Sequence, residues 1–238
     1  MFESKYNKVL TIILIIVIVA IVLLLSFLTF DYIKKVNNTK QASNFVNSFQ
    51  SEIENSNSNN EIANENVTNS TTETPEENMT LNSNETQINN GSSGSSSSSE
   101  NKKKYQGLTV VGTMKIPAIN LEYPIVEETS TTALEKALVA LYPNGDNLNQ
   151  PGNTVIIGHN YRNGQFFSNL KKLSNGAKIY VTDFRGKSIT YEVYNKFEAL
   201  STDASFYGRD TNGLPELTLS TCTDTNNDQR TIIFAKQI

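Results

Sequence analysis

The chain has 238 residues, with 20 basic and 24 acidic side chains that give a formal net charge of −4. A balance so close to neutral provides no broad positive surface, so nucleic acid is not expected as a partner. One cysteine and one histidine are present. A lone cysteine excludes a disulfide within the chain, and together with a lone histidine it disfavours a structural zinc site.

The N-terminal part contains an apolar run over residues 9–30, interrupted only by Thr11, Ser26 and Thr29. At about 1.5 Å of rise per residue, a helix of this length spans roughly 33 Å, enough to cross a hydrocarbon core. A cleavable signal peptide has a shorter apolar region followed by a small-residue cleavage site, and neither feature is found here. The run predicts an uncleaved transmembrane anchor. Lysines flank it on both sides, so the positive-inside rule does not decide its orientation.

The next segment, residues 31–104, is dominated by asparagine, serine, threonine and glutamate. Between residues 37 and 101, nine glutamates stand against one lysine. Such a composition buries too little apolar surface to offset the entropy of ordering, so it predicts a disordered spacer. Phe45, Val46 and Phe49 are exceptions that can prolong the membrane-proximal helix briefly.

Residues 105–238 have the pattern of a folded domain that is mostly β. Short runs rich in Val, Ile, Tyr and Thr alternate with Pro, Gly, Asn and Asp, which is typical of strands and turns. One helix is predicted over residues 131–141 with Ser130 as its cap, a shorter one over 165–173, and a hairpin turn over 183–187. Many strands with few helices indicate a closed antiparallel barrel or a sandwich. Strands are predicted at residues 110–116, 121–126, 154–157, 178–182, 188–197, 216–222 and 230–236.

The last two predicted strands bring Cys222 and Arg230 together. If these strands form a symmetric hairpin, the two residues face each other at its mouth, with Cβ atoms about 4.5–5.5 Å apart. The same register pairs Ser220 with Ile232, and it assigns Leu217, Leu219, Ile233 and Ala235 to the opposite, core-facing side. A thiol at a strand end beside a fixed positive charge is in the environment of a reactive cysteine.

His159 strengthens this interpretation, because it also follows an apolar strand. Alone, each residue has an ordinary explanation: a free cysteine is most often buried and inert, a histidine structural, and an arginine solvated. The combination of these three types at strand ends favours a Cys–His catalytic pair with an arginine partner.

These residues resemble the sortase family. Thr-Leu-Ser-Thr-Cys over 218–222, the arginine that opens the next strand and Gly-His-Asn over 158–160 match its motifs, and the similarity covers residues 108–238. The resemblance implies a closed antiparallel β-barrel of about eight strands. It also implies a single-pass type II protein of a Gram-positive cell membrane, with residues 1–8 in the cytoplasm and the domain 105–238 outside.

The resemblance also implies an activity and its partners. Cys222 matches the nucleophile that attacks the Thr–Gly bond of an LPXTG-like sorting signal and forms a thioacyl enzyme. His159 matches the general acid and base, and Arg230 the residue that holds the substrate carbonyl and its oxyanion. Thr221 matches the threonine beside the nucleophile. The expected partners are surface-protein precursors with a C-terminal sorting signal, and an amine acceptor from cell-wall precursor or a pilin.

These motifs leave some details of the site, the subclass and the function undecided. Ser220, Thr221 and Ile232 are predicted substrate contacts, and no residue is clearly placed to orient His159, since Asn160 is its sequence neighbour. No cofactor is expected, and no acidic cluster supports the calcium site that some relatives have. The subclass is undecided, although residues 198–214 are too few for the long helix that some sortases insert there. A hydrolytic cysteine protease and a catalytically idle, tethered binding module are the alternative functions.

Overall fold

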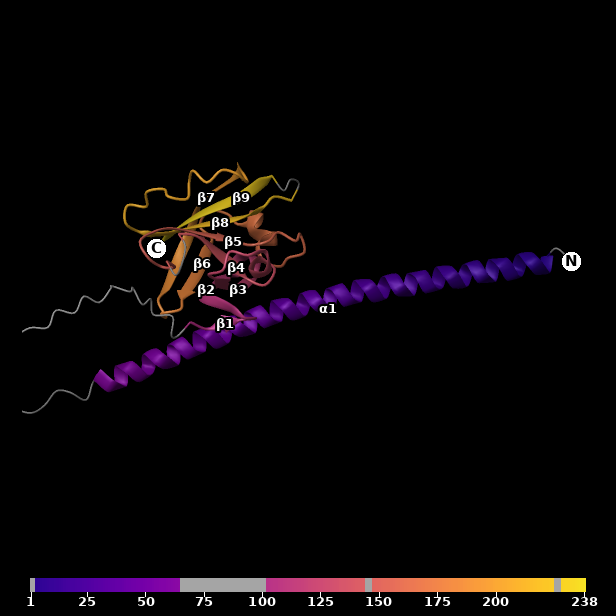
Figure 1. The fold of residues 1–238 in the computed structure, drawn as a ribbon, viewed down its shortest axis with the longest axis horizontal. Coiled ribbons are helices and arrows are strands. Elements are labelled where there is room, and N and C mark those ends of the chain that lie inside the picture. Colours follow the sequence, from indigo (N-terminus) through magenta and orange to yellow (C-terminus); the bar gives the residue numbers. More distant parts are fainter. Residues whose placement is uncertain (1–2, 65–101, 144–146, 225–227) are drawn as a thin grey trace, which may run out of the picture.

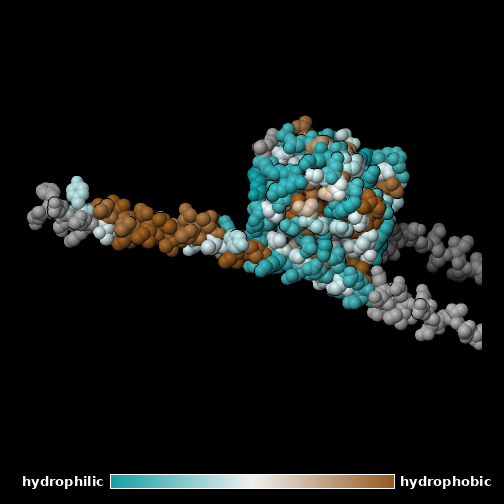
Figure 2. Space-filling view, turned by 180° about the vertical axis from the view of Figure 1, so that it is seen from behind, coloured by the Kyte–Doolittle hydropathy of each residue, from teal (hydrophilic) through white to brown (hydrophobic). Residues whose placement is uncertain are grey.

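The structure is a computed structural model that describes residues 3–64, 102–143, 147–224 and 228–238 (Figure 1). Helix α1, Glu3–Asn64, extends from the N-terminus along one side of a β domain. Among the described residues, one helix is long and apolar enough to cross a membrane, and its most apolar window has a mean hydropathy of 3.5. Figure 2 shows this apolar stretch projecting away from the hydrophilic surface of the domain.

The prediction of a disordered spacer is wrong for residues 31–64, which continue α1. Ala42, Val46 and Phe49 are buried at helical spacing on one face of the helix. Phe49 belongs to an apolar cluster with Tyr105 and with side chains of the barrel. The segment is helical because these few apolar residues share a face that the barrel covers. The prediction from composition missed this, because it weighs the average polarity of the segment and not the spacing of its apolar residues. The remainder of the predicted spacer, residues 65–101, lies outside the described residues.

The domain is a closed barrel of eight strands, as predicted. The order around the barrel is β2-β3-β4-β5-β8-β9-β7-β6, and β2 also pairs with β6 to close it. The short strand β1 pairs with the first residues of β2. The prediction of an antiparallel barrel is wrong at two pairs, β3–β4 and β5–β8, which are parallel because the connections between these strands cross over instead of forming hairpins. The other pairs are antiparallel. The strands are β1 Lys104–Tyr105, β2 Leu108–Ile116, β3 Leu121–Val126, β4 Leu138–Tyr142, β5 Gly152–Ile157, β6 Lys178–Asp183, β7 Ser188–Leu200, β8 Pro215–Cys222 and β9 Gln229–Gln237.

The predicted helix over 131–141 is wrong beyond its first turn. Helix α2 spans only Thr131–Leu134, and the Ala133 amide donates to the Ser130 hydroxyl cap at 3.0 Å. The chain then enters β4, which pairs with both β3 and β5. Pairing on two sides outweighs the helical spacing of the leucines, because it satisfies the backbone and buries residues 137–140.

The other local predictions are confirmed. The predicted segment 165–173 contains a 3₁₀ helix, η2, over Phe167–Lys172, and a second 3₁₀ turn, η1, covers Pro117–Ile119. Residues 183–187 form the turn between β6 and β7, where Gly186 takes a φ of +88° that favours glycine. The barrel interior is filled by large side chains from most strands and from η2, including Met114, Ile156, Phe167, Tyr191 and Leu217.

Candidate active site

The register of β8 and β9 is the one that the sequence predicts. Cys222 pairs with Arg230, Ser220 with Ile232, and Thr218 with Phe234. The alternate residues of the two strands are buried in the main core, as expected: Leu217, Leu219, Ile233 and Ala235. The seven-residue connection therefore places the only thiol and a permanent cation on the same face of the hairpin mouth.

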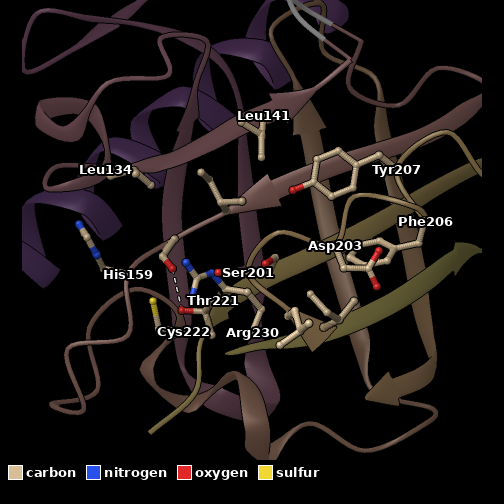
Figure 3. Close-up of a pocket in the computed structure, with 15 residues that line it drawn as sticks. Leu134, Leu141, His159, Ser201, Asp203, Phe206, Tyr207, Thr221, Cys222 and Arg230 are labelled. Carbon is tan, nitrogen blue, oxygen red and sulfur yellow. Dashed lines mark hydrogen bonds between the residues drawn. The ribbon is translucent and has the colours of Figure 1, made fainter. Parts of the chain in front are cut away.

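His159 is placed beside the thiol by the parallel pairing of β5 and β8. Ile157 pairs with Ser220, so the residues that follow β5 run alongside the end of β8. The Thr221 hydroxyl donates to the Gly158 carbonyl at 2.7 Å and joins the two strand ends directly (Figure 3). A Cβ at Gly158 would lie 2.7 Å from Leu138 Cδ2 and 3.0 Å from Phe167 Cδ2. The backbone that carries His159 is therefore fixed by close packing as well as by this hydrogen bond.

A pocket of about 310 Å³ contains all six residues that the sequence singled out. In Figure 3, His159, Cys222 and Arg230 lie at one end of it, and Asp203, Phe206 and Tyr207 at the other. The residues of this far end were missed, since they belong to a connection with no recognised motif. The signal that could have found them is an aromatic pair inside a polar loop. The other lining residues are Leu134, Leu141, Ile157, Gly158, Leu200 and Ser201.

The loop that carries Phe206 and Tyr207 is tied to the barrel by polar contacts. Asn153 Nδ2 donates to the Tyr207 carbonyl at 2.8 Å. Arg209 donates to Glu216 at 2.7 Å, and its guanidinium lies 4.0 Å from the centre of the Phe234 ring. This wall of the pocket is therefore positioned by side chains of β5, β8 and β9 before any ligand arrives.

The environment of His159 favours the neutral ring. Burial lowers the pKa of His159 below its ordinary value of 6.5, and the nearby Glu135 carboxylate partly opposes this shift. The ring stacks on Tyr161 with a centroid distance of 4.7 Å. At neutral pH the imidazole can accept a proton, as a general base requires.

Asn160 does not orient His159, in agreement with the expectation from sequence. Its Nδ2 donates to the Cys222 carbonyl at 2.9 Å and to Asp224 Oδ1 at 2.8 Å. Among the described residues, no hydrogen bond joins the Cys222 thiol to the His159 ring, a separation common in active sites without substrate. Over the same residues, no three His, Cys, Asp or Glu side chains gather as ligands for a metal ion.

Comparison with known proteins gives a consistent result. The sortase domain family model matches residues 114–238. Sortase A of Streptococcus agalactiae serotype III (strain NEM316) is 28% identical over 137 residues, covering 56% of this chain and 55% of that protein. Sortase A of Bacillus anthracis is 26% identical over 133 residues, covering 53% and 58%. The chain thus spans a little over half the length of either relative.

Solved structures agree with the sequence comparisons. Sortase A from Corynebacterium diphtheriae superposes with a TM-score of 0.50 at 29% identity, covering 55% of this chain and 61% of that one. Sortase C-1 from Actinomyces oris, at 24% identity and a TM-score of 0.50, shares the fold over 54% of this chain and 74% of its own. With a family model that covers more than half of its residues, the chain belongs to the sortase family.

Proposed function

We propose that this sortase is a membrane-anchored cysteine transpeptidase that cleaves an LPXTG-like sorting signal and transfers the surface protein to an amine. The observation that carries this proposal is the register pair Cys222–Arg230 at the end of a pocket that also contains His159. A nucleophile, a proton carrier and an oxyanion partner are the three parts that acyl transfer through a cysteine requires.

In the first half-reaction, neutral His159 takes the proton of the Cys222 thiol, and the thiolate attacks the carbonyl carbon of the Thr–Gly bond. The carbonyl oxygen becomes an oxyanion that accepts hydrogen bonds from Arg230, whose guanidinium stays charged at any physiological pH. When the C–N bond breaks, His159 gives its proton to the leaving amine. The thioacyl enzyme and the distal segment of the signal result.

In the second half-reaction, an amine attacks the thioester carbon and forms a C–N bond. His159 accepts the proton that the amine loses, the C–S bond breaks, and the Cys222 thiolate leaves and takes that proton back. The enzyme returns to its starting protonation state, and the surface protein is joined to the acceptor. Cell-wall precursor and pilin amines are the acceptors that we propose, and no metal ion or cofactor enters either half-reaction.

The membrane arrangement is part of the same proposal. The apolar side chains of residues 9–30 are exposed on α1, which suits a bilayer. Sortase catalysis on surface proteins also requires the barrel outside the cytoplasm. We therefore propose a single-pass type II protein, with residues 1–8 on the cytoplasmic side and residues 105–238 on the cell surface of a Gram-positive bacterium.

The test is peptide cleavage by the full chain in detergent, with a library of sorting-signal peptides, with and without a primary amine, and in the presence of a chelator. We expect a covalent adduct on Cys222 by mass spectrometry and an amide product with the amine. Cys222→Ala should form neither. Hydrolysis without amide formation at any amine concentration would instead identify a protease, and the absence of cleavage of every peptide would leave a binding module.

A further inference from the structure

A second hollow, of about 730 Å³, lies between α1 and the segment that follows β5. Lys34 and Lys35 of the helix line one side, and Tyr161 and Phe166 of the barrel line the other. Gln165 Nε2 donates to the Lys35 carbonyl at 3.4 Å, so the two sides are in direct contact at one edge. The hollow is built jointly by the anchor helix and the catalytic domain, and nothing in the proposed donor chemistry uses it.

This hollow adjoins the candidate active site across the catalytic histidine. The Tyr161 ring, which lines the hollow, stacks on the His159 ring, which lines the pocket of Cys222. The neighbours Leu134 and Glu135 also link the two cavities, because Leu134 lines the pocket of Cys222 and Glu135 lines the hollow. The two spaces are thus separated by one layer of side chains, and His159 belongs to that layer.

The hollow carries charges of both signs. Glu135 lines the hollow and acts electrostatically on the His159 and Tyr161 rings, so a negative charge stands within reach of the histidine. Lys34, Lys35 and Asp31 come from the helix, directly after the apolar run that ends at residue 30. A ligand that fits this distribution has a primary amine near Glu135 and carboxylate groups near the lysines. Its place beside the apolar run means that the ligand is held close to the membrane surface.

We propose that this hollow is the acceptor site: it binds a peptide that carries the attacking primary amine and directs that amine past Tyr161 to the thioester on Cys222. This inference rests on the proposed function and adds the location and chemical class of the second substrate. The donor signal and the acceptor then approach His159 from different sides, so one imidazole can serve the leaving amine and the incoming one without exchange of ligands in one pocket. The anchor helix becomes part of the substrate site as well as a tether.

The test fills the hollow from the helix side. Asn38 lines it, is exposed and can be changed to tryptophan, whereas Asn37 is also exposed but does not line it, so Asn37→Trp is the matched control. The full chain in phospholipid nanodiscs is acylated with a cleavable sorting-signal peptide. The thioacyl enzyme is then partitioned between water and two amines: triglycine as a peptide acceptor, and hydroxylamine as an acceptor too small to need the hollow.

The readout is the ratio of amide to hydrolysis product. Both products come from the same thioacyl enzyme, so the ratio does not depend on how fast that enzyme forms. For Asn38→Trp we expect the ratio with triglycine to fall at least about tenfold, because the peptide amine is no longer held in position for attack. The ratio with hydroxylamine should stay unchanged. For Glu135→Gln we expect the concentration of triglycine that gives half the maximal ratio to rise about tenfold, since a charge-assisted contact is lost.

The opposing results are equally definite. An unchanged triglycine ratio in Asn38→Trp would overturn the proposal, and so would an equal fall in Asn37→Trp or with hydroxylamine, because each would show a general disturbance. Failure of the proposed function is distinguishable, since the wild-type chain would then form no thioacyl enzyme, or would hydrolyse it without forming an amide with either amine.

Discussion

Replacing Phe49 with alanine should detach the membrane-proximal part of α1 from the barrel. The Phe49 side chain is 2% exposed and belongs to the apolar cluster that includes Tyr105, Val110 and Val126. Its ring also lies 6.1 Å from that of Phe45, which in turn is 5.1 Å from the Tyr105 ring. Phe49 is thus the largest buried apolar side chain that the helix contributes to this contact.

The magnitude follows from this burial. Truncation of a buried phenylalanine costs about 3–5 kcal/mol in a core. Because Phe49 lies between a helix and a barrel and can relax more than a core residue, we take the lower end, about 3 kcal/mol. That free energy corresponds to about a hundredfold change in the docking equilibrium. An undocked polar helix has little stability of its own in water, so the amides of residues 42–53 should lose their protection.

Hydrogen exchange of the full chain in detergent, read by mass spectrometry, measures this equilibrium. We expect exchange of the peptide that covers residues 42–53 to accelerate by about two orders of magnitude in Phe49→Ala, with the barrel strands unchanged. Asn44→Ala, at an exposed position of the same helix, is the control and should leave the exchange as it is. Equal exchange in the two variants would show that the helix is held by something other than this apolar contact.

Three further predictions concern the site. Arg230→Lys keeps the charge but loses the planar pair of donors, so kcat for peptide cleavage should fall by about 10²–10³-fold. Iodoacetamide should still alkylate Cys222 at close to the wild-type rate. Near-normal peptide cleavage would refute an oxyanion role for Arg230. Removing the Glu135 charge should lower the pKa of His159 further, because the carboxylate favours the imidazolium. The NMR titration of this single histidine and the acid limb of the cleavage rate should both move to lower pH. A move to higher pH would contradict this effect of Glu135 on His159. Arg209→Met should raise the KM for the sorting peptide several-fold with a smaller change in kcat, because the loop with Phe206 and Tyr207 loses the contacts of Arg209 to Glu216 and Phe234. A fall in kcat as large as the rise in KM would contradict this role of Arg209.

The sequence alone determined the elements whose physics is local. Two strands joined by a short connection must alternate faces with a period of two, so once the hairpin is assumed symmetric, Cys222 has to face Arg230 and Leu219 has to enter the core. The apolar run over residues 9–30 is local in the same sense, since its length and lack of charge are sufficient to predict a membrane helix. The close match of the motif around Cys222 to sortases added the barrel itself.

Only the tertiary structure decided the features that depend on a distant partner. The segment after Leu134 became β4, because two neighbouring strands could pair with it and local helical spacing could not compete. The polar stretch of α1 is ordered because the barrel presents an apolar surface at the height of Phe49. The pocket wall around Tyr207 is fixed through Asn153, more than fifty residues away. In each case the stabilising contact is made between residues far apart in sequence. The hydrophobic pattern of the segment itself therefore does not reveal the contact that orders it.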